Sequence, residues 1–370
     1  MLINNDRGQS TDLVDLVKAL ERSVTPMGLR FQDIYHSYAD TSALRGITLE
    51  AKDGEILCLL GRSGCGKSTL LNLAAGILPV QAGSIALGGT PLASQQHNPP
   101  PEKRSVGLVF QDSALFPHLT VAQNIGFGLR DRPSRQAVVN DLLEQIGLSG
   151  LGERFPHTLS GGQQQRVAVA RALAPAPQVL LMDEPFASID ISLRRQLREE
   201  TRRLVKARDC ATILVTHDPE EALEIADRIA VMEEGRITQC GTGRELHAEP
   251  ASLFVGLMAG SGAVLSATRM NGIAKTRFGR FEAQDLSFFT PPRNDEPVDI
   301  LIRPHCAALQ NDPSGLRITD VRHTGRSQIV TLDDMDSDSL LLELDPEPVW
   351  FPGDRVLIRT NGKPWPAFTC

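Results

Sequence analysis

The sequence contains no stretch long enough to cross a membrane, and its six cysteines show no pairing pattern. The most apolar runs, EILCLLG (55–61) and QVLLMDE (178–184), are short and end in polar or turn residues. A membrane helix needs about 18 or more apolar residues, so any role at a membrane is expected to depend on partner proteins. The cysteines include no CxxC pair, which argues against a disulfide framework and a zinc site.

An excess of basic charge is also missing. The chain has 38 Lys and Arg against 45 Asp and Glu, a net charge of −7, which gives no electrostatic basis for binding nucleic acid. The opening MLINNDRGQS has neither a basic region nor an apolar core, so we expect no secretory signal and a cytosolic chain. The 370 residues are 41% hydrophobic, which suits two or three folded domains.

Three segments with different patterns follow one another along the chain. Residues 1–27 are polar and predict a disordered extension, or a start codon assigned too early. Residues 28–258 alternate strand and helix patterns, with a mostly helical part at about 113–171, and predict an α/β domain whose first two strands form an antiparallel edge. Residues 263–370 contain short β-forming runs such as VDILIRPH, which predict a small all-β, OB-like domain.

A glycine-rich loop gives the strongest chemical signal. The segment GRSGCGKST fits G-x-x-x-x-G-K-[ST] and lies between a predicted strand and a predicted helix. Its glycines let backbone N–H groups surround a phosphate, Lys67 can reach the β- and γ-phosphates, and the Ser68 hydroxyl can bind Mg²⁺. The alternative is a chance glycine-rich turn, which this context disfavours. The predicted nucleotide-binding residues of the loop are Gly61, Arg62, Ser63, Gly64, Cys65, Gly66, Lys67, Ser68 and Thr69.

Two adjacent carboxylates follow a second buried strand. In VLLMDEP, four apolar residues lead to Asp183 and Glu184, at the strand edge where α/β sheets bind ligands. Asp183 can hold Mg²⁺ through water, and Glu184 can polarise an attacking water. Such a pair is often only a surface feature, but its combination with a phosphate loop favours a nucleotide-hydrolysing site.

The segment LSGGQQQR begins a predicted helix. Ser160 is positioned as its N-cap, and Gly161, Gly162 and Gln163 expose backbone donors. A second anion-binding helix start is redundant if each monomer completes its own site. It is useful if it covers a nucleotide held by another copy of the chain.

Together these motifs resemble the ATPase subunits of ABC transporters, in which LSGGQ is the signature sequence. The resemblance covers about residues 28–258. It implies that Tyr38 stacks on adenine, that Gln111 contacts Mg²⁺ and the attacking water, and that His217 contacts the γ-phosphate. A buried strand tyrosine and an ordinary histidine after a strand are the alternatives for Tyr38 and His217.

The resemblance also assigns the loop after Glu184 and the metal ligands. Asp190 retains the acid of the family's S-A-L-D segment, whereas Ala187 has lost the serine hydroxyl, a change that could alter how the two sites of a dimer are linked. The implied cofactors are ATP and Mg²⁺. The metal ligands implied are Ser68, Gln111 and Asp183.

The class of transporter follows from the remaining features. The chain has one ATPase cassette, no sustained heptads and no fused membrane domain, unlike DNA-repair, translation-factor and many exporter relatives. DILIRPH (299–305) is similar to motifs of the regulatory TOBE domain of importers. The resemblance therefore implies a homodimer at the cytoplasmic face of the membrane, bound to integral-membrane permease subunits and acting indirectly with a solute-binding protein.

The solute is predicted from resemblance alone. Residues 99–129 resemble the corresponding segment of ferric-iron, polyamine and sulfate or phosphonate importers, and Phe116 replaces a tyrosine common in sugar importers. The C-terminal segment favours ferric iron, with the other solutes as alternatives. An ABC ATPase with a partner unrelated to transport is the second class of function considered.

Overall fold

The computed structural model describes residues 28–129, 133–187, 189–288, 296–333 and 339–369. The predicted N-terminal extension, 1–27, lies outside these residues. The chain divides into two compact units. The first unit runs to His217 and takes in Glu224–Asp227 and Met232–Ile237, while the second comprises Asp218–Leu223, Arg228–Val231 and the chain from Thr238. Among the described residues, no helix is long and apolar enough to span a membrane.

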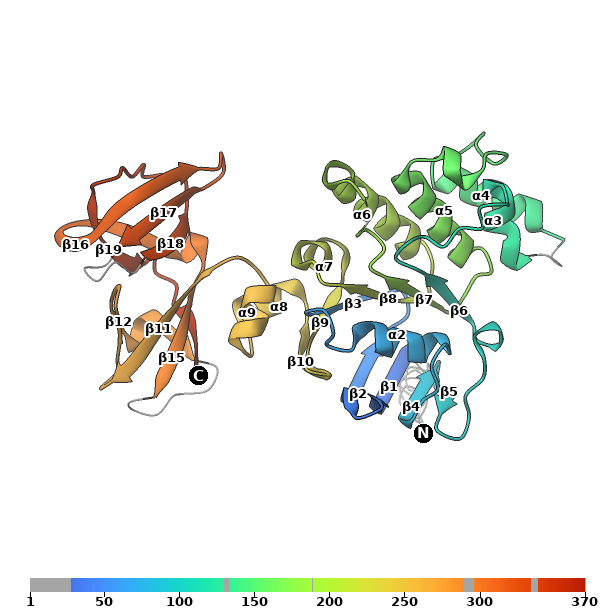
Figure 1. Cartoon of the computed structure of the whole chain (residues 1–370), viewed down its shortest axis with the longest axis horizontal. Coiled ribbons are helices and arrows are strands. Elements are labelled where there is room, and N and C mark those ends of the chain that lie inside the picture. The colour runs from blue at the N-terminus through green and yellow to red at the C-terminus, as the bar shows by residue number, and fades with distance from the viewer. Residues whose placement is uncertain (1–27, 130–132, 188, 289–295, 334–338, 370) are drawn as a thin grey trace, which may run out of the picture. The chain divides into compact units, whose positions relative to one another are not determined.

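An antiparallel sheet opens the first unit (Figure 1). Its strands are β1 (Leu29–Tyr38), β2 (Thr41–Ala51), β4 (Ala82–Leu87) and β5 (Thr90–Ser94), in the order β2-β1-β4-β5. Apolar residues of β1 alternate with polar ones, so that one face of the strand is buried. The first two strands are antiparallel as predicted, but they join β4 and β5 in a sheet of their own. β5 was not predicted.

The second sheet is mostly parallel and has the order β10-β9-β3-β8-β7-β6. β3 (Ile56–Leu60) is fully buried in the middle of the sheet, as its continuous apolar run predicts. The other strands are β6 (Val106–Val109), β7 (Val179–Asp183), β8 (Ala211–Thr216), β9 (Arg228–Glu233) and β10 (Arg236–Gly241). The run RIAVMEEGRI reads as one strand but forms two, because Glu234 and Gly235 both have positive φ and reverse the chain.

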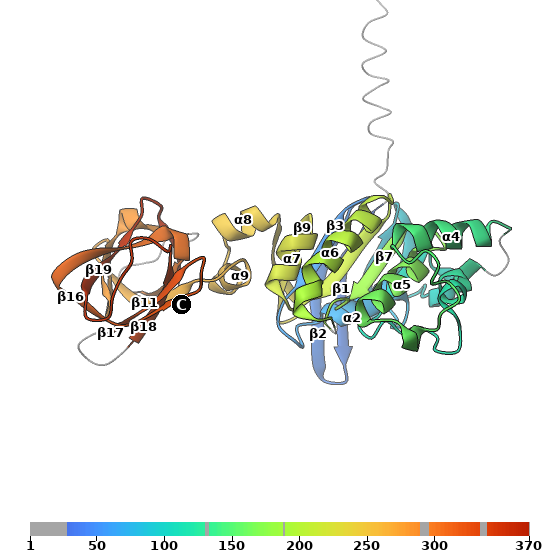
Figure 2. The same cartoon turned by 90° about the horizontal axis from the view of Figure 1, so that it is seen from above.

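Helices gather at the β7–β6 end of this sheet, as both views show (Figures 1 and 2). They are α3 (Val121–Ile125), α4 (Arg135–Gln145) and α5 (Gly161–Leu173), which share an apolar core. The predicted helical part of the domain is therefore present. α6 (Ile191–Lys206) follows β7, and α7 (Pro219–Ile225) follows β8.

The helix α2 (Lys67–Ala75) packs against β2 on one side and against β6, β7 and β8 on the other. Its C-terminal end is held by Arg104, which is only 6% exposed. The Arg104 guanidinium donates to the carbonyls of Leu73 (2.7 Å) and Ala74 (2.9 Å), where a cation complements the helix dipole. This contact fixes the helix whose other end carries the glycine-rich loop.

The second unit contains an all-β domain, as predicted, with its strands divided between two sheets. Their orders are β13-β12-β11-β15-β20-β14 and β18-β17-β16-β19, and the pairing is antiparallel except between β14 and β20. Preceding them are two short helices, α8 (Gly243–Ala248) and α9 (Leu253–Met258). The strands are β11 (Ala263–Met270), β12 (Ile273–Thr276), β13 (Gly279–Glu282), β14 (Leu286–Phe288), β15 (Pro297–Ile302), β16 (Ala307–His323), β17 (Gln328–Asp333), β18 (Ser339–Leu344), β19 (Arg355–Thr360) and β20 (Trp365–Thr369).

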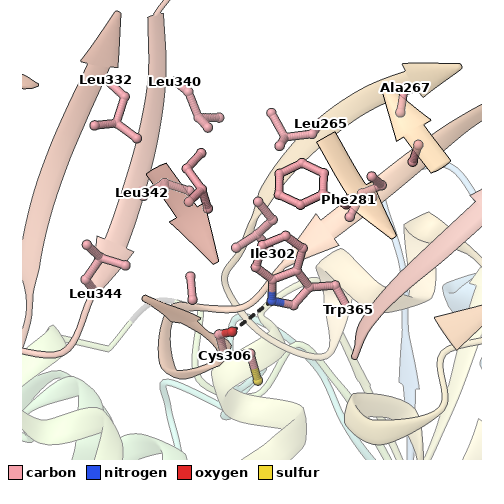
Figure 3. Close-up of a cluster of buried hydrophobic side chains, with 14 of the residues drawn as sticks. Leu265, Ala267, Phe281, Ile302, Cys306, Leu332, Leu340, Leu342, Leu344 and Trp365 are labelled. Atoms are coloured by element: carbon pink, nitrogen blue, oxygen red, sulfur yellow. Dashed lines mark hydrogen bonds between the residues drawn. The ribbon is translucent and has the colours of Figure 1, made fainter. Parts of the chain in front are cut away.

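Side chains of both sheets share one core (Figure 3). Trp365 is fully buried there and meets the ring of Phe281 edge-on at 5.0 Å. Its indole N–H donates to the carbonyl of Cys306 at 2.8 Å, which satisfies its only polar atom. The domain thus has a hydrophobic core of its own.

A half-buried carboxylate, that of Asp227, joins two elements of the first unit. Asp227 accepts hydrogen bonds from the Ile56 amide (2.8 Å), the Arg202 guanidinium (2.7 Å) and the Lys206 ammonium (3.0 Å). Burial acts to raise the pKa of Asp227, but these three donors outweigh it and hold the pKa below its usual value. Asp227 therefore ties the start of β3 to α6.

We predict that Asp227→Asn lowers the free energy of unfolding by about 2 kcal/mol at pH 7, because a neutral amide accepts weaker hydrogen bonds than a carboxylate. The folded-state pKa lies below the unfolded-state value of about 3.9, so this stabilisation is complete above that value and is lost as the pH falls through the folded-state pKa. Urea unfolding should show the difference between the two proteins shrinking below about pH 4. Glu199→Gln, which removes an exposed partner of Arg203, is the control and should change stability little.

Candidate functional site

The register of the parallel strands brings four loops to one edge of the sheet. Leu60 is opposite Thr216, Asp183 is opposite Val215, and Val109 is opposite Met182. The segments that follow these strands, starting at Gly61, Phe110, Glu184 and His217, therefore leave the sheet at the same level. This is the carboxyl edge at which α/β sheets bind ligands.

The glycine-rich loop folds tightly at this edge. A Cβ on Gly61 would lie 2.3 Å from the carbonyl oxygen of Met232, and Gly66, with φ of 106°, would place one 2.6 Å from that of Ala43. Gly66 is the N-cap of α2, and no side chain caps this helix. The amides of its first turn are therefore available to an anion.

Lys67 lies under the same loop and is 5% exposed. Its ammonium donates to the carbonyls of Gly61 (2.8 Å) and Arg62 (3.0 Å) and lies 3.7 Å from the Cys65 sulfur. Among the described residues, the hydrogen-bond acceptors of this ammonium are two carbonyls and a sulfur, none of them a carboxylate. The geometry thus places a buried positive charge beside the uncapped start of α2, which suits a phosphate.

Ser68 and Asp183 face each other across the edge. The Ser68 hydroxyl donates to the Asp183 carboxylate at 3.2 Å. Burial raises the pKa of Asp183, and the charge of Glu184 adds to this effect, while the Ser68 hydrogen bond and Lys67 oppose it. A cation bound between these two oxygens would relieve the cost of burying the carboxylate.

Glu184 and His217 form a second pair, with 3.0 Å between the glutamate Oε1 and the histidine Nδ1. Glu184 is held in a left-handed backbone conformation (φ 43°), which few non-glycine residues adopt. Its amide donates to the Val215 carbonyl at 2.9 Å. The neighbouring strand and the histidine thus fix a carboxylate that can orient a water molecule.

Tyr38 lies at the end of β1, next to the start of α2. Its hydroxyl is 3.4 Å from the Thr69 hydroxyl, and its ring is 48% exposed. His36, which is 3% exposed, meets this ring edge-on at 4.9 Å. Burial lowers the pKa of His36, so its neutral ring supports the tyrosine from behind. An exposed and supported aromatic ring beside a phosphate loop can stack on a base.

Gln111 is exposed in the turn that follows β6. Arg171 of α5 holds the same turn by donating to the carbonyls of Ala114 (2.7 Å) and Ser113 (3.1 Å). The Arg171 guanidinium also lies 5.4 Å from the centre of the Phe116 ring. The turn is therefore attached to α5 rather than free to move alone.

The LSGGQ segment forms the predicted helix start. Ser160 is the N-cap of α5: its hydroxyl accepts from the Gln163 amide (3.4 Å), and the Gln163 side chain accepts from the Ser160 amide (3.0 Å). Ser160 and Gly161 are exposed, and a Cβ on Gly162 would meet nothing within 4 Å. The N-terminus of α5 is thus accessible to an anion from outside.

The loop after Glu184 leads to Asp190, the N-cap residue of α6. The Arg194 side chain donates to the carbonyls of Ile189 (2.8 Å) and Ala187 (3.4 Å). The side chain of Asp190 does not cap the helix, and the Ser192 hydroxyl lies 3.5 Å from it. Asp190 is exposed, so its carboxylate can contact another molecule.

The chain is similar to known proteins. The family described as ABC transporter matches residues 44–187. The sulfate/thiosulfate import ATP-binding protein of Caulobacter vibrioides is 40% identical over 326 residues, which are 86% of this chain and 92% of that protein. The Fe(3+) ions import ATP-binding protein of Pseudomonas fluorescens is 42% identical over 78% of this chain and 80% of its own length. The chain belongs to the ATP-binding subunits of ABC importers.

Two further matches support this assignment. The spermidine/putrescine import ATP-binding protein of Methylococcus capsulatus is 47% identical over 64% of this chain and 62% of that protein. The structure of cbiO1 from Clostridium perfringens, part of the ABC transporter complex cbiONQ, has a TM-score of 0.56 and 32% identity over 61% of this chain and 92% of that chain. As a member of this family, the importer subunit is an ATPase that binds ATP.

The structure brings most of the predicted residues of the importer subunit to one edge but separates one group. The loop 61–69, Asp183, Glu184 and His217 meet at the ends of β3, β7 and β8. Ser160–Gln163 begin α5, which packs with α3, α6 and β6, whereas the loop begins α2. Three residues that support the site, His36, Arg104 and Arg171, were not predicted from the sequence. His36 is an aromatic side chain two residues before Tyr38, whereas nothing in the sequence around the two arginines indicates their contacts.

We predict that Glu184→Gln lowers kcat for ATP hydrolysis about a hundredfold or more, because an amide cannot take a proton from the attacking water. ATP affinity should change little, since Lys67 and the α2 amides are unaltered. Equilibrium nucleotide binding and steady-state phosphate release by the purified chain are the measurements. The control is Glu144→Gln on the exposed face of α4; turnover of Glu184→Gln equal to that of this control would contradict the assignment.

Proposed function

We propose that the chain hydrolyses ATP as a head-to-tail dimer, with each ATP held between the glycine-rich loop of one copy and Ser160–Gln163 of the other. The observation that supports this is the pair of anion-binding helix starts on separate helices. The N-terminus of α2 lies at the strand edge with the carboxylates, and the capped N-terminus of α5 is exposed. When two copies face each other, the N-terminus of α2 in one copy and the N-terminus of α5 in the other can bind the same nucleotide.

In the proposed site each of the predicted residues has a chemical role. The α2 amides and Lys67 hold the phosphates, and Tyr38 stacks on the adenine. Glu184, oriented by His217, positions the attacking water, and Gln111 contacts the same water. Asp190 faces the partner copy. Hydrolysis removes the γ-phosphate that joins the two copies, so the dimer opens again.

The residues at the edge also fit Mg²⁺. Among the described residues no group of three or more His, Cys, Asp or Glu could hold a metal, but Mg²⁺ is commonly bound by one or two carboxylates together with phosphates and water. Ser68 and Asp183 offer hard oxygen donors 3.2 Å apart, and Gln111 completes the proposed set. When bound, Mg²⁺ neutralises the charge that develops on the phosphates.

A permease subunit is the proposed partner, and the hollow beside the Gln111 turn is its proposed contact. This hollow has a volume of about 600 Å³ and is lined by Phe110, Ala114, Phe116, Phe127 and Arg171, among others. Phe110 is exposed and Phe116 and Phe127 are partly exposed, and accessible aromatic rings around an arginine are typical of a protein contact. Docking there would place the chain at the cytoplasmic face of the membrane and connect the permease to the turn that carries Gln111.

Sulfate or thiosulfate is the proposed solute, delivered to the permease by a solute-binding protein. It is supported by two sulfate/thiosulfate import proteins that match nearly from end to end, over 92% and 98% of their lengths, so that their C-terminal parts are included. Ferric iron, favoured by the sequence analysis, is the second candidate, supported by the match to the Pseudomonas protein. We also propose that the C-terminal domain is TOBE-like and regulates the subunit.

The shared site predicts complementation between two inactive proteins. Ser160→Arg damages the half-site offered to the partner, while Lys67→Ala damages the chain's own half-site. In a mixed dimer both changes fall on one site and leave the other intact, so an equal mixture should recover roughly a quarter of wild-type ATPase activity. Each variant alone, at the same total protein concentration, is the control. An equal mixture that stays inactive, although both proteins dimerise, would rule out the shared site.

The solute proposal predicts a selective loss of uptake. Deleting the gene in the organism that encodes it should abolish uptake of radiolabelled sulfate and leave uptake of ferric iron and spermidine unchanged. The intact gene should restore sulfate uptake, and the Glu184→Gln gene should not. Loss of iron uptake with normal sulfate uptake would replace sulfate by ferric iron.

A further inference from the structure

A buried polar contact links the Gln111 turn to the signature helix. The Ser113 hydroxyl donates to Oε1 of Gln165 at 2.7 Å, and the two residues are 8% and 1% exposed. Gln165 lies in α5, five residues after Ser160, among apolar neighbours such as Val167 and Ala168 that are fully buried. The amide nitrogen of Gln165 is buried without a hydrogen-bond partner.

This contact costs stability compared with an apolar one. A buried amide N–H without a partner costs about 1–3 kcal/mol, and an apolar residue of similar volume at 165 would avoid that cost. Positions that break a local rule in this way are expected at functional sites. The only partner of the Gln165 side chain among the described residues is Ser113, so any function of Gln165 acts through that turn.

The turn itself is strained. Ser113 and Ala114 are consecutive non-glycine residues with positive φ, 61° and 42°, and each such residue costs about 1–2 kcal/mol. Two side chains of α5 hold this conformation. Gln165 accepts from the Ser113 hydroxyl, and Arg171 donates to the carbonyls of Ser113 and Ala114. Without these contacts the turn would relax to ordinary backbone angles.

Gln111 lies two residues before the strained pair. β6 ends at Val109, opposite Met182, so the direction in which the chain leaves the sheet at 110–113 decides where the Gln111 amide lies relative to Asp183. A change of backbone angles at Ser113 would displace that amide. Displacements of about 1 Å at a reacting centre can reduce the rate about a hundredfold.

We propose that Gln165 is a positioning residue for ATP hydrolysis, which holds the strained turn through Ser113 and thereby sets the Gln111 amide at the γ-phosphate. The inference rests on the proposed role of Gln111. In this proposal α5 has two functions: its N-terminus contacts the nucleotide of the partner copy, and its side chains position Gln111. Any movement of α5 is transmitted to Gln111 by the Gln165 hydrogen bond and by the hydrogen bonds of Arg171.

The test removes the hydrogen bond from each side in the full-length chain. Ser113→Ala and Gln165→Leu should each lower kcat about tenfold or more, with ATP affinity near that of the unaltered protein. Gln165→Leu should keep or raise the melting temperature because it removes the unpartnered amide, whereas Ser113→Ala leaves the Gln165 oxygen buried without its donor and should lower it. Because one interaction is lost in both cases, the double variant should lose no more than either single variant. Ser105 lies just before β6, and its hydroxyl accepts a hydrogen bond from the Gln178 backbone N–H at 3.2 Å. Ser105→Ala removes this bond and should leave kcat unchanged.

The proposal and the role of Gln111 fail in different ways. Gln111→Ala should itself lower kcat, and Ser113→Ala should add no further loss to it. If Gln111→Ala retains full turnover, the proposed role of Gln111 is wrong. If Gln111→Ala is slow but Ser113→Ala turns over within about twofold of the unaltered chain, or the two hydrogen-bond lesions add independently, the positioning role of Gln165 is overturned. A fall of both kcat and melting temperature in Gln165→Leu would mean that the contact is only structural.

Discussion

The hydrogen-bonded register of the parallel strands is the constraint on which the site depends. The glycine-rich loop is separated from the carboxylate pair by more than a hundred positions, as Ser68 and Asp183 are by 115, and His217 follows Glu184 by 33. Their strands nevertheless pair so that all of them end at one level. A shift by one residue in any of these strands would turn its side chains to the opposite face. The fully buried apolar faces of β3 and β8 prevent such a shift, so the core of the sheet determines the geometry of the catalytic edge.

The electrostatics of this edge are unbalanced in a way that suits ATP. Lys67 is buried against carbonyls, and burial raises the pKa of Asp183. A protein selected only for stability would pair these charges or replace them. In the proposed site, a triphosphate with its metal ion would supply anionic oxygens for Lys67 and a cation for Asp183, so that binding would relieve two desolvation costs at once. The same reasoning explains why the first turn of α2 has no side-chain cap.

The features that could be predicted from the sequence are those whose residues are close together in the chain. The loop 61–69, the pair Asp183–Glu184 and the capped start at Ser160 each carry their chemistry within a few positions, and their strand or helix context follows from short apolar periods. Gln165 and Arg171 were missed because their partners are 52 and 57 positions away. The split of RIAVMEEGRI into β9 and β10 was missed because Glu234 adopts a positive φ, which its residue type does not favour. The solute is not encoded in these motifs, because in the proposed function other proteins bind it.

Three strained residues of the first unit lie beside the site. Glu184, Ser113 and Ala114 all have positive φ without being glycine, and all three follow the ends of β6 and β7. Their conformations are maintained by contacts from other elements: Val215 and His217 for Glu184, and α5 for the other two. Strain that depends on a second element is released when that element moves. Glu184 is therefore held by the sheet, whereas the turn that carries Gln111 is held by the helix that begins with LSGGQ. In the proposed dimer, a contact at the start of this helix would be felt at one side of the site and not at the other.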